Sequence, residues 1–536
     1  MSTSNNNLKE KRQIDKTSFW PATIITLAFG ALFFIIPEQS NAALSVIHAF
    51  TTNQLGWFFL LFTLIILGVC FFYAFSPMGK IVLGKTGEKP IMSTKTWLAM
   101  VLISGTGGNL LYLGAIEWIW IVADPPFGLA PESVEAYRWA MAYGMFHWGP
   151  SAWGLYVACA IPIAYFFFVK RRSNMKMSDY ARPLLGKQSD GIAGHALNFL
   201  YIFGLLGGVL TSMALGTAPI SEGIAYVLGL ERSNVVIDVI VMGLWTFVPL
   251  GALWLGLKKG IVRLGKVNIW AMVLLLVAIF ILGPTWFIFN QSTEGLGVML
   301  QNYVLMSLHT DPIGQGGFPQ AWTIFYMSWW AVYAMPFGLF IAKISKGRTI
   351  RQTVVGALSA GSIGCMLFYM VLPAFGMNMQ LTGKADLVTT LAEYGRGRVV
   401  IEMLQSFPLG LGGIAIVFFI VLVLFCFITG HITVGYSLAA ATEKKLSQDQ
   451  DPQRWNVTFW LILAGVVSLG LYLLNPAALK PLQTVSILAG FPICFAILIL
   501  VLSFLKQVKK DFPTGIPLPK NSEEHVYGVP DDDAEE

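Results

Sequence analysis

Two adjacent tryptophans, Trp329 and Trp330, lie in the middle of an apolar segment that is long enough to cross a membrane, at about 321–344. In a helix, Trp329 would lie roughly 13 Å along the axis from the start of this segment. Tryptophans of membrane helices usually lie near the headgroups, whereas this depth is close to the midplane of a hydrocarbon core about 30 Å thick. Tyr333 shares a helix face with both indoles. Because buried aromatic faces attract a cation without a counter-charge, the pattern indicates a site for a quaternary ammonium group.

A second aromatic group, Trp148, Trp153 and Tyr156, lies in another apolar segment at about 140–169. Trp153 and Tyr156 are three residues apart and share a helix face. Trp148 precedes Trp153 by five residues, so it joins that face only where Gly149-Pro150 alters the helical turn. Each desolvated cation–π contact contributes about 2 kcal/mol, so three or four rings offset much of the dehydration of a diffuse cation. The alternative is that these rings serve packing or the membrane interface alone.

Ionisable residues inside apolar segments are a further source of chemistry. Glu117 is by default a functional candidate, predicted to act in gating or coupling, with a position near the membrane interface as the alternative. His147, beside Trp148, is interpreted as hydrogen-bonded structure, and titration near neutral pH is the alternative. Glu222 leaves the same two possibilities open.

The residue patterns of an enzyme are missing. Neither His-Glu-x-x-His nor Gly-x-Ser-x-Gly occurs, and His147 has no acidic neighbour along the chain. The five cysteines lie singly in apolar stretches, without the spacing of metal ligands. We therefore expect no enzymatic activity, no cofactor and no metal site.

The composition is that of a membrane protein. Of the 536 residues, 55% are hydrophobic and 12% are charged, against about 25% charged in soluble domains. Twelve apolar stretches are long enough to span a bilayer, at approximately 19–36, 55–75, 97–122, 140–169, 196–228, 234–256, 267–290, 321–344, 353–377, 408–440, 456–474 and 482–505. The chain is therefore predicted to be an all-α polytopic membrane protein of 12 transmembrane helices, surrounded by a lipid bilayer.

The basic residues predict the orientation of these helices. With a cytoplasmic N-terminus, all but six of the 35 lysines and arginines fall in the tails and in every second loop. The six others are Arg138, Arg232, Lys384, Arg396, Arg398 and Lys480. Both termini are thus predicted to be cytoplasmic, and the excess of basic charge implies no nucleic-acid partner. We expect a cytoplasmic tail at 1–18, a twelve-helix domain at 19–506 and an acidic-ended cytoplasmic tail at 507–536.

Two of the segments are predicted to be interrupted. The third contains the glycine-rich run Ser104–Asn109, which disfavours a regular helix, and the eighth contains Pro336 and Gly338. They are five segments apart, as expected where segments 3–7 and 8–12 form two related halves. Interrupted helices in corresponding positions of two halves are typical of a transport site. The alternative is close packing of small residues between helices.

Several stretches resemble the betaine/choline/carnitine transporter family, most closely its carnitine/γ-butyrobetaine antiporter branch. They are Asp124–Leu129, Phe146–Pro150, Asp311–Gln320, Trp322–Trp330 and Ile344–Arg351. The resemblance covers about residues 18–506. It implies a leucine-transporter-type fold with two inverted five-helix repeats, helices 3–7 and 8–12, after two extra N-terminal helices. It also implies a homotrimer in the bacterial inner membrane.

The resemblance also assigns substrate-binding residues. The family's aromatic box maps onto Trp148, Trp153, Trp329 and Trp330, with Tyr156 and Tyr333 nearby and Trp120 at a position that is a tyrosine in the antiporter. The substrate carboxylate is expected to face the backbone at Gly105, Thr106, Gly107, Gly108 and Asn109, where amides can donate hydrogen bonds.

The coupling residues depart from both branches of the family. Two threonines of a sodium site correspond to Leu205 and Val209, so that site is expected to be absent. In the antiporter an arginine takes the place of a second sodium ion, and that position is Asn268 in this chain. The antiporter's substrate-facing methionine corresponds to Phe337. Thr429, near the second sodium site, is retained. The prediction is a secondary transporter that exchanges carnitine, γ-butyrobetaine or a close betaine by alternating access. A sodium- or proton-coupled importer is the alternative.

Overall fold

The computed structural model describes residues 13–516 except 86, 106, 173–175, 257, 445–449 and 475–479, and omits the side chains of 103–105, 258–262, 474 and 480–482. In this part of the chain every regular element is a helix, apart from two isolated bridges. The predicted all-α class is confirmed.

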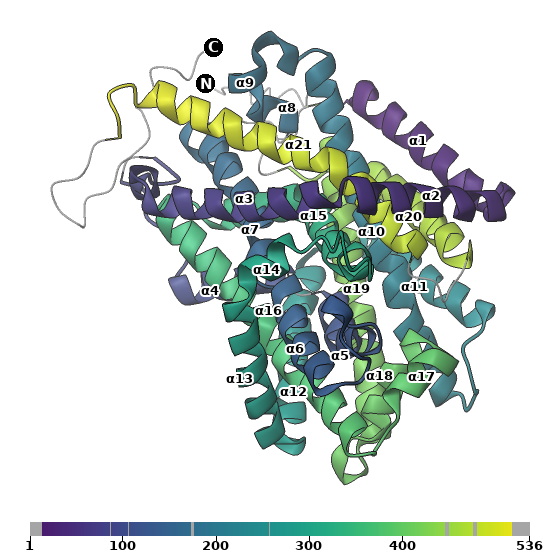
Figure 1. Ribbon diagram of the computed structural model, residues 1–536. Helices are drawn as coiled ribbons and strands as arrows, with labels where there is room; N and C mark the ends of the chain where they lie inside the picture. The colour runs from purple at the N-terminus through teal and green to yellow at the C-terminus, as the bar shows by residue number, and fades with distance from the viewer. Residues whose placement is uncertain are drawn as a thin grey trace, which may run out of the picture.

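Eleven helices or runs of helices in the described part are long and apolar enough to cross a membrane. They are α1 (Lys16–Ile35), α3 (Gly56–Phe75), α6 (Val134–His147) with α7 (Pro150–Ala164) and η3 (Tyr165–Val169), α10 (Ile192–Val227), α11 (Val235–Trp254), α12 (Lys258–Leu282), η5 (Pro319–Thr323) with α15 (Ile324–Ile344), α16 (Ile350–Leu381), α19 (Gly412–Ala441), α20 (Arg454–Leu474) and α21 (Lys480–Asp511). The remaining predicted segment, which is the third along the chain, corresponds to two helices, α4 (Thr94–Gly105) and α5 (Gly108–Ala123) (Figure 1).

Shorter helices connect these segments. They are α2 (Pro37–Gln54), η1 (Pro77–Lys80), η2 (Pro126–Gly128), α8 (Met177–Tyr180), α9 (Arg182–Leu185), η4 (Gly186–Ser189), α13 (Thr285–Gln301), α14 (Tyr303–Leu308), α17 (Leu387–Tyr394), α18 (Arg396–Gln405) and η6 (Pro408–Gly410). The seventh segment ends at Leu282 rather than near residue 290, because Gly283-Pro284 stops α12 before α13 begins.

The interruption predicted in the third segment is confirmed. α4 ends at Gly105, and α5 starts at Gly108 after an extended Gly107 with φ −114° and ψ 179°. Gly108 also lies against the Phe427 ring of α19, since a Cβ there would be 2.5 Å from a ring carbon. Glycine therefore permits both the interruption between α4 and α5 and the close approach of α19.

The interruption predicted in the eighth segment is wrong. α15 continues without a break through Pro336 and Gly338. Gly338 instead lets α15 pack closely on α7, because a Cβ there would lie 2.7 Å from Cys159 Cβ and 3.1 Å from the Tyr156 carbonyl oxygen. Pro336 removes only one backbone N–H, and the surrounding helix packing compensates. Close packing of small residues is the correct interpretation here.

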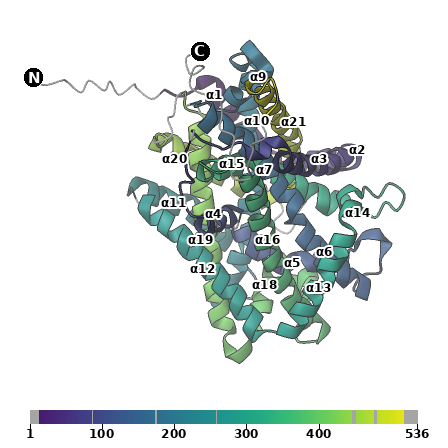
Figure 2. The same cartoon turned by 90° about the vertical axis from the view of Figure 1, so that its left-hand side faces the viewer.

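The short helices give a different indication of two opposed halves. α8 and α9 follow the second segment of the first half, and α17 and α18 follow the second segment of the second half. The two pairs lie at opposite ends of the molecule (Figures 1 and 2). This arrangement is the one expected for two halves of inverted orientation.

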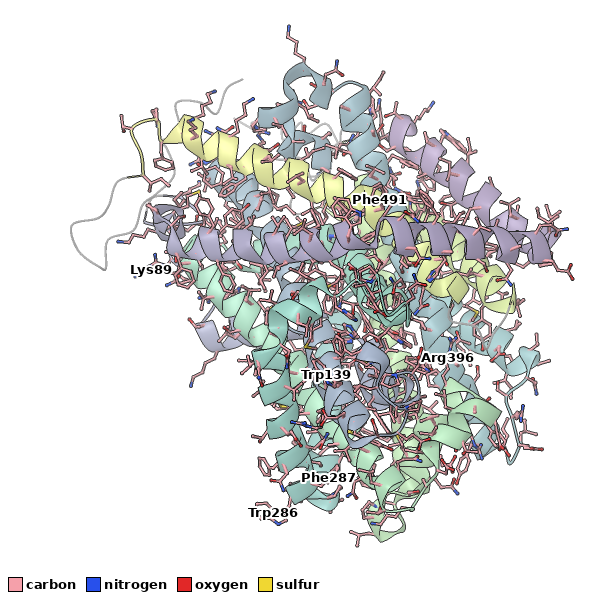
Figure 3. The ribbon with its side chains drawn as sticks, in the orientation of Figure 1. Lys89, Trp139, Trp286, Phe287, Arg396 and Phe491 are labelled. Carbon is pink, nitrogen blue, oxygen red and sulfur yellow. The ribbon has the colours of Figure 1, made fainter. Side chains whose placement is uncertain are left out.

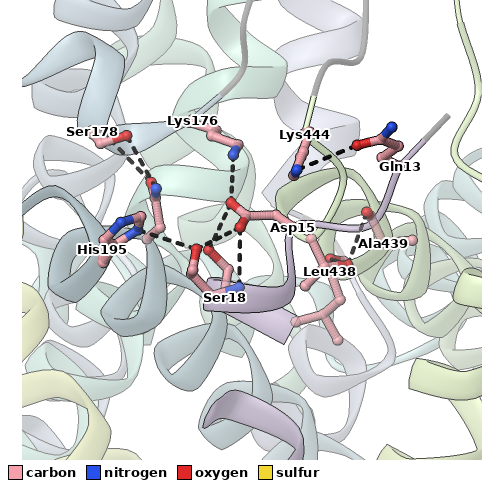
Figure 4. Close-up of polar contacts among 12 residues, drawn as sticks. Gln13, Asp15, Ser18, Lys176, Ser178, His195, Leu438, Ala439 and Lys444 are labelled. Carbon is pink, nitrogen blue, oxygen red and sulfur yellow. Dashed lines mark hydrogen bonds and ion pairs between the residues drawn. The ribbon is translucent and has the colours of Figure 1, made fainter. Parts of the chain in front are cut away.

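The first and last described helices are fastened to the same end of the molecule. Asp15 caps α1 and accepts a hydrogen bond from Lys176 Nζ at 2.5 Å (Figure 4). Asp511, the last residue of α21, accepts from Tyr165 OH at 2.6 Å and from Lys170 Nζ at 3.2 Å. Tyr165 and Lys170 contact Asp511, and Lys176 contacts Asp15, so the start of α1 and the end of α21 lie on one side.

The outer surface is rich in exposed apolar side chains. Trp286, at the start of α13, is 80% exposed and points away from the protein (Figure 3). By contrast, Phe491 lies where α21 crosses α3, with its ring centroid 5.3 Å from that of Phe58 (Figure 3). An extensive apolar surface fits a lipid environment.

Candidate functional site

The site is built where the α6–α7 bend meets α15. Trp148 closes α6 with φ −110° and ψ 9°, and Gly149 is extended with ψ −151° before Pro150 begins α7. A Cβ on Gly149 would lie 2.7 Å from the Met145 carbonyl oxygen, so only glycine fits this turn. The expectation that Gly149-Pro150 alters the turn is met, and the bend brings Trp148 and Trp153 to the same ring of α15.

The four tryptophans assigned to the aromatic box meet in the structure. The Trp330 ring centroid lies 5.2 Å from that of Trp148 and 6.2 Å from that of Trp153. Trp148 is also 6.3 Å from Trp329, with the ring planes at 89°. Tyr156 completes the cluster at 5.0 Å from Trp330, and all five side chains are buried.

These rings contact one another directly, at separations typical of aromatic pairs. A cation held between two opposed ring faces lies up to about 6 Å from each ring centroid. The two centroids are then further from each other than the ring centroids are in this cluster. The described rings are therefore packed against one another, with no space for a cation between two opposed faces. The indole N–H groups of Trp329 and Trp330 are buried without a hydrogen-bond partner, so they are donors available to a ligand.

Tyr333 and Phe337 extend the cluster toward the end of α15. Phe337 stacks on Tyr156 at 5.0 Å and lies 5.6 Å from Tyr333. The Tyr333 hydroxyl is hydrogen-bonded to Ser212 Oγ of α10 at 2.8 Å. Helices from both halves thus contribute to one aromatic wall.

A fully buried polar network lies directly beneath Trp148. Glu117 Oε1 is 2.7 Å from His147 Nδ1, and Glu117 Oε2 accepts hydrogen bonds from the hydroxyls of Tyr326 and Tyr369, each at 2.7 Å. His147 Nε2 lies 3.1 Å from Thr323 Oγ1. His147 is hydrogen-bonded as interpreted, but it does have an acidic partner, since Glu117 approaches from another helix. Glu117 is 0% exposed.

The network supports the box through two tyrosine rings. Tyr369 of α16 stacks on Trp148 with centroids 5.4 Å apart and planes at 29°. Tyr326 of α15 meets Trp148 at 6.3 Å and stacks on His147 at 4.5 Å. Sequence reasoning missed both tyrosines. Tyr326 follows Thr323 by three residues and precedes Trp330 by four, which is a usable helical signal, whereas nothing in the chain marks Tyr369.

The remaining predicted substrate-binding residues lie on α5 or at the break between α4 and α5. Trp120 stacks on Trp322 with centroids 4.8 Å apart. Gly105, Gly107, Gly108 and Asn109 border the α4–α5 break, and Thr106 lies outside the described residues. Asn109 Oδ1 is buried without a partner.

The predicted coupling positions form no charged site. Leu205 and Val209 are buried apolar residues of α10. Asn268 Nδ2 of α12 lies 3.5 Å from Thr429 Oγ1, whose hydroxyl also donates to the Cys426 carbonyl of α19 at 2.9 Å. A neutral hydrogen bond thus joins α12 and α19 at this position.

Comparison with models of protein families gives one finding. Residues 17–513 match the model described as BCCT, betaine/carnitine/choline family transporter. The match includes every helix from α2 to α21 and all of α1 except its first residue.

Proposed function

Since the chain belongs to the betaine/carnitine/choline transporter family, we propose that it exchanges trimethylammonium zwitterions, namely carnitine, γ-butyrobetaine or a close betaine, across the membrane. The observation that carries the proposal is the cluster of four tryptophan rings, in which Trp148 contacts both Trp329 and Trp330, and Trp153 contacts Trp330. A trimethylammonium cation has no N–H group to donate, so a site made of hydrogen-bond acceptors binds it poorly. Aromatic rings attract such a cation through their π faces.

The same site offers groups for the other end of a zwitterion. The free N–H donors of Trp329 and Trp330, and the helix start at Gly107–Gly108, suit a carboxylate. The apolar Leu205 and Val209 offer no oxygen ligands for sodium. Exchange of related substrates needs no ion gradient and is therefore favoured.

Ion-coupled import is a second candidate, with a specific observation in its favour. The Thr429 hydroxyl remains next to Asn268, and Glu117 lies 2.7 Å from His147 Nδ1 in a buried hydrogen-bonded network. The two candidates make different demands on gradients, so transport assays separate them.

The test is uptake of labelled carnitine into proteoliposomes preloaded with γ-butyrobetaine, carnitine, glycine betaine or buffer, with and without a sodium gradient. Exchange predicts uptake only into vesicles loaded with a trimethylammonium compound, whatever the sodium gradient. Uptake into empty vesicles that follows an imposed sodium or proton gradient overturns exchange in favour of the importer.

We further propose a homotrimer in the bacterial inner membrane with both termini cytoplasmic. The shared side of Asp15 and Asp511 supports placing the two ends together. Cysteine substitutions near each end, labelled with an impermeant maleimide in intact cells and in lysed cells, test the orientation. Labelling in intact cells refutes it.

A further inference from the structure

The buried Glu117–His147 pair has no role in cation binding by the rings alone, and it joins four helices. Glu117 is on α5, His147 ends α6, and the partners Tyr326 and Tyr369 are on α15 and α16. Both ionisable side chains are 0% exposed. A titratable pair of this kind is costly in an apolar interior, which makes it a functional candidate.

The charge of this pair depends on one proton. Within the described residues, no lysine or arginine forms an ion pair with Glu117, whose only charged partner is His147. Apart from those two, the groups that face the pair are the neutral Tyr326, Tyr369 and Thr323. Tyr143, on the same helix as His147, adds a ring at 5.4 Å. The network is therefore neutral with imidazolium and carries −1 with neutral imidazole.

The network is one ring away from the box. The Tyr369 and Tyr326 hydroxyls donate to Glu117, and their rings contact Trp148. A cation held by Trp148 and Trp330 interacts favourably with the −1 state and not with the neutral state. Few polar groups separate them, so the interaction is little screened.

We propose that the Glu117–His147 pair binds one exchangeable proton, and that a trimethylammonium cation in the tryptophan box displaces this proton to solvent. The inference rests on the proposed function, because it requires that the box bind such a cation. The charge balances, because the substrate brings one positive charge into the tryptophan box and one proton leaves His147 for solvent. No covalent bond of the substrate changes. Substrate binding is then linked to proton release, and affinity rises with pH.

The linkage depends on the substrate's own charge. In a zwitterion, the carboxylate offsets part of the attraction between the ammonium group and Glu117. Choline carries no carboxylate, so it should displace more proton than glycine betaine does. A charge–charge interaction over one intervening ring is expected to alter affinity by about tenfold.

The test is isothermal titration calorimetry of the full chain in lipid nanodiscs, with choline and glycine betaine as probes. Titrations in two buffers of different ionisation enthalpy give the number of protons released, and the dissociation constant is measured from pH 5.5 to 8.5. We expect up to one proton released, more for choline, and choline affinity about tenfold weaker at the acidic end.

The variant His147→Gln removes the titrating group and keeps a hydrogen-bond donor toward Glu117. We expect it to bind choline without proton release and with a flat pH profile. The matched control is His431→Gln, which replaces a buried histidine of α19 outside the proposed network, and it should behave as the wild type.

Saturable binding by the wild type without proton release overturns this inference alone. Equal proton release by the wild type and His147→Gln also overturns it. Absence of binding by both probes and by carnitine overturns the proposed function as well. Where His147→Gln does not fold, the wild-type difference between choline and glycine betaine decides, and equal proton release with the two probes refutes the inference.

Discussion

Replacement of Trp330 by leucine is the most direct test of the aromatic box. Trp330 is the common neighbour of Trp148, Trp153 and Tyr156, with ring centroids at 5.2, 6.2 and 5.0 Å. Leucine fills part of the space and offers no π face. Loss of one desolvated cation–π contact costs about 2 kcal/mol, which corresponds to roughly 30-fold weaker binding.

The assay is equilibrium binding of labelled carnitine to purified protein by scintillation proximity, which does not depend on tryptophan fluorescence. The matched control is Trp286→Leu, since Trp286 is 80% exposed at the start of α13 and points away from the protein (Figure 3). A loss of less than threefold in Trp330→Leu refutes the reasoning, and so does an equal loss in the control. Thermal unfolding of both variants excludes a folding defect as the cause.

Three further predictions concern other contacts. Gly338→Leu should prevent close packing of α7 on α15, because a Cβ there already lies 2.7 Å from Cys159; size-exclusion chromatography should show aggregation, and a normal profile contradicts the packing argument. Tyr333→Phe should weaken binding by less than about tenfold through loss of one hydrogen bond to Ser212. Burial opposes ionisation of Asp15, but hydrogen bonds led by that from Lys176 hold the pKa of its carboxyl below the usual value. Its stabilising effect, about 1 kcal/mol as a helix cap, should be present at pH 7 and vanish as pH falls below about 4. The difference in melting temperature between wild type and Asp15→Ala across pH measures this effect, and a difference that grows with acidity refutes it.

Helix boundaries illustrate how far sequence reasoning reaches. The glycine-rich run before Asn109 predicted a real break, because glycine disfavours helix in any context. Pro336 and Gly338 predicted a break that is absent. Their effect depends on what packs beside them, and α7 fits against Gly338. Local propensity is decisive where nothing opposes it and is overridden where a neighbouring helix supplies compensating contacts.

The box itself was predictable in part. Trp153 with Tyr156, and Trp330 with Tyr333, follow helical spacing, so their shared faces were evident. Trp120 was grouped with the box by resemblance, yet its ring stacks on Trp322. Helical spacing defines a face but not the partner of that face, and the partner depends on how separate helices cross.

The sequence by itself determined the membrane class and the apolar segments, and it predicted the depth of the adjacent tryptophans. A hydrocarbon core imposes length and hydrophobicity on each helix independently of its neighbours. Only the tertiary structure decided that Glu117 meets His147, Tyr326 and Tyr369 beneath Trp148. These partners are 30, 209 and 252 residues away along the chain. The positions of those hydrogen-bonding groups are determined by the packing of four helices, which no local pattern in the chain specifies.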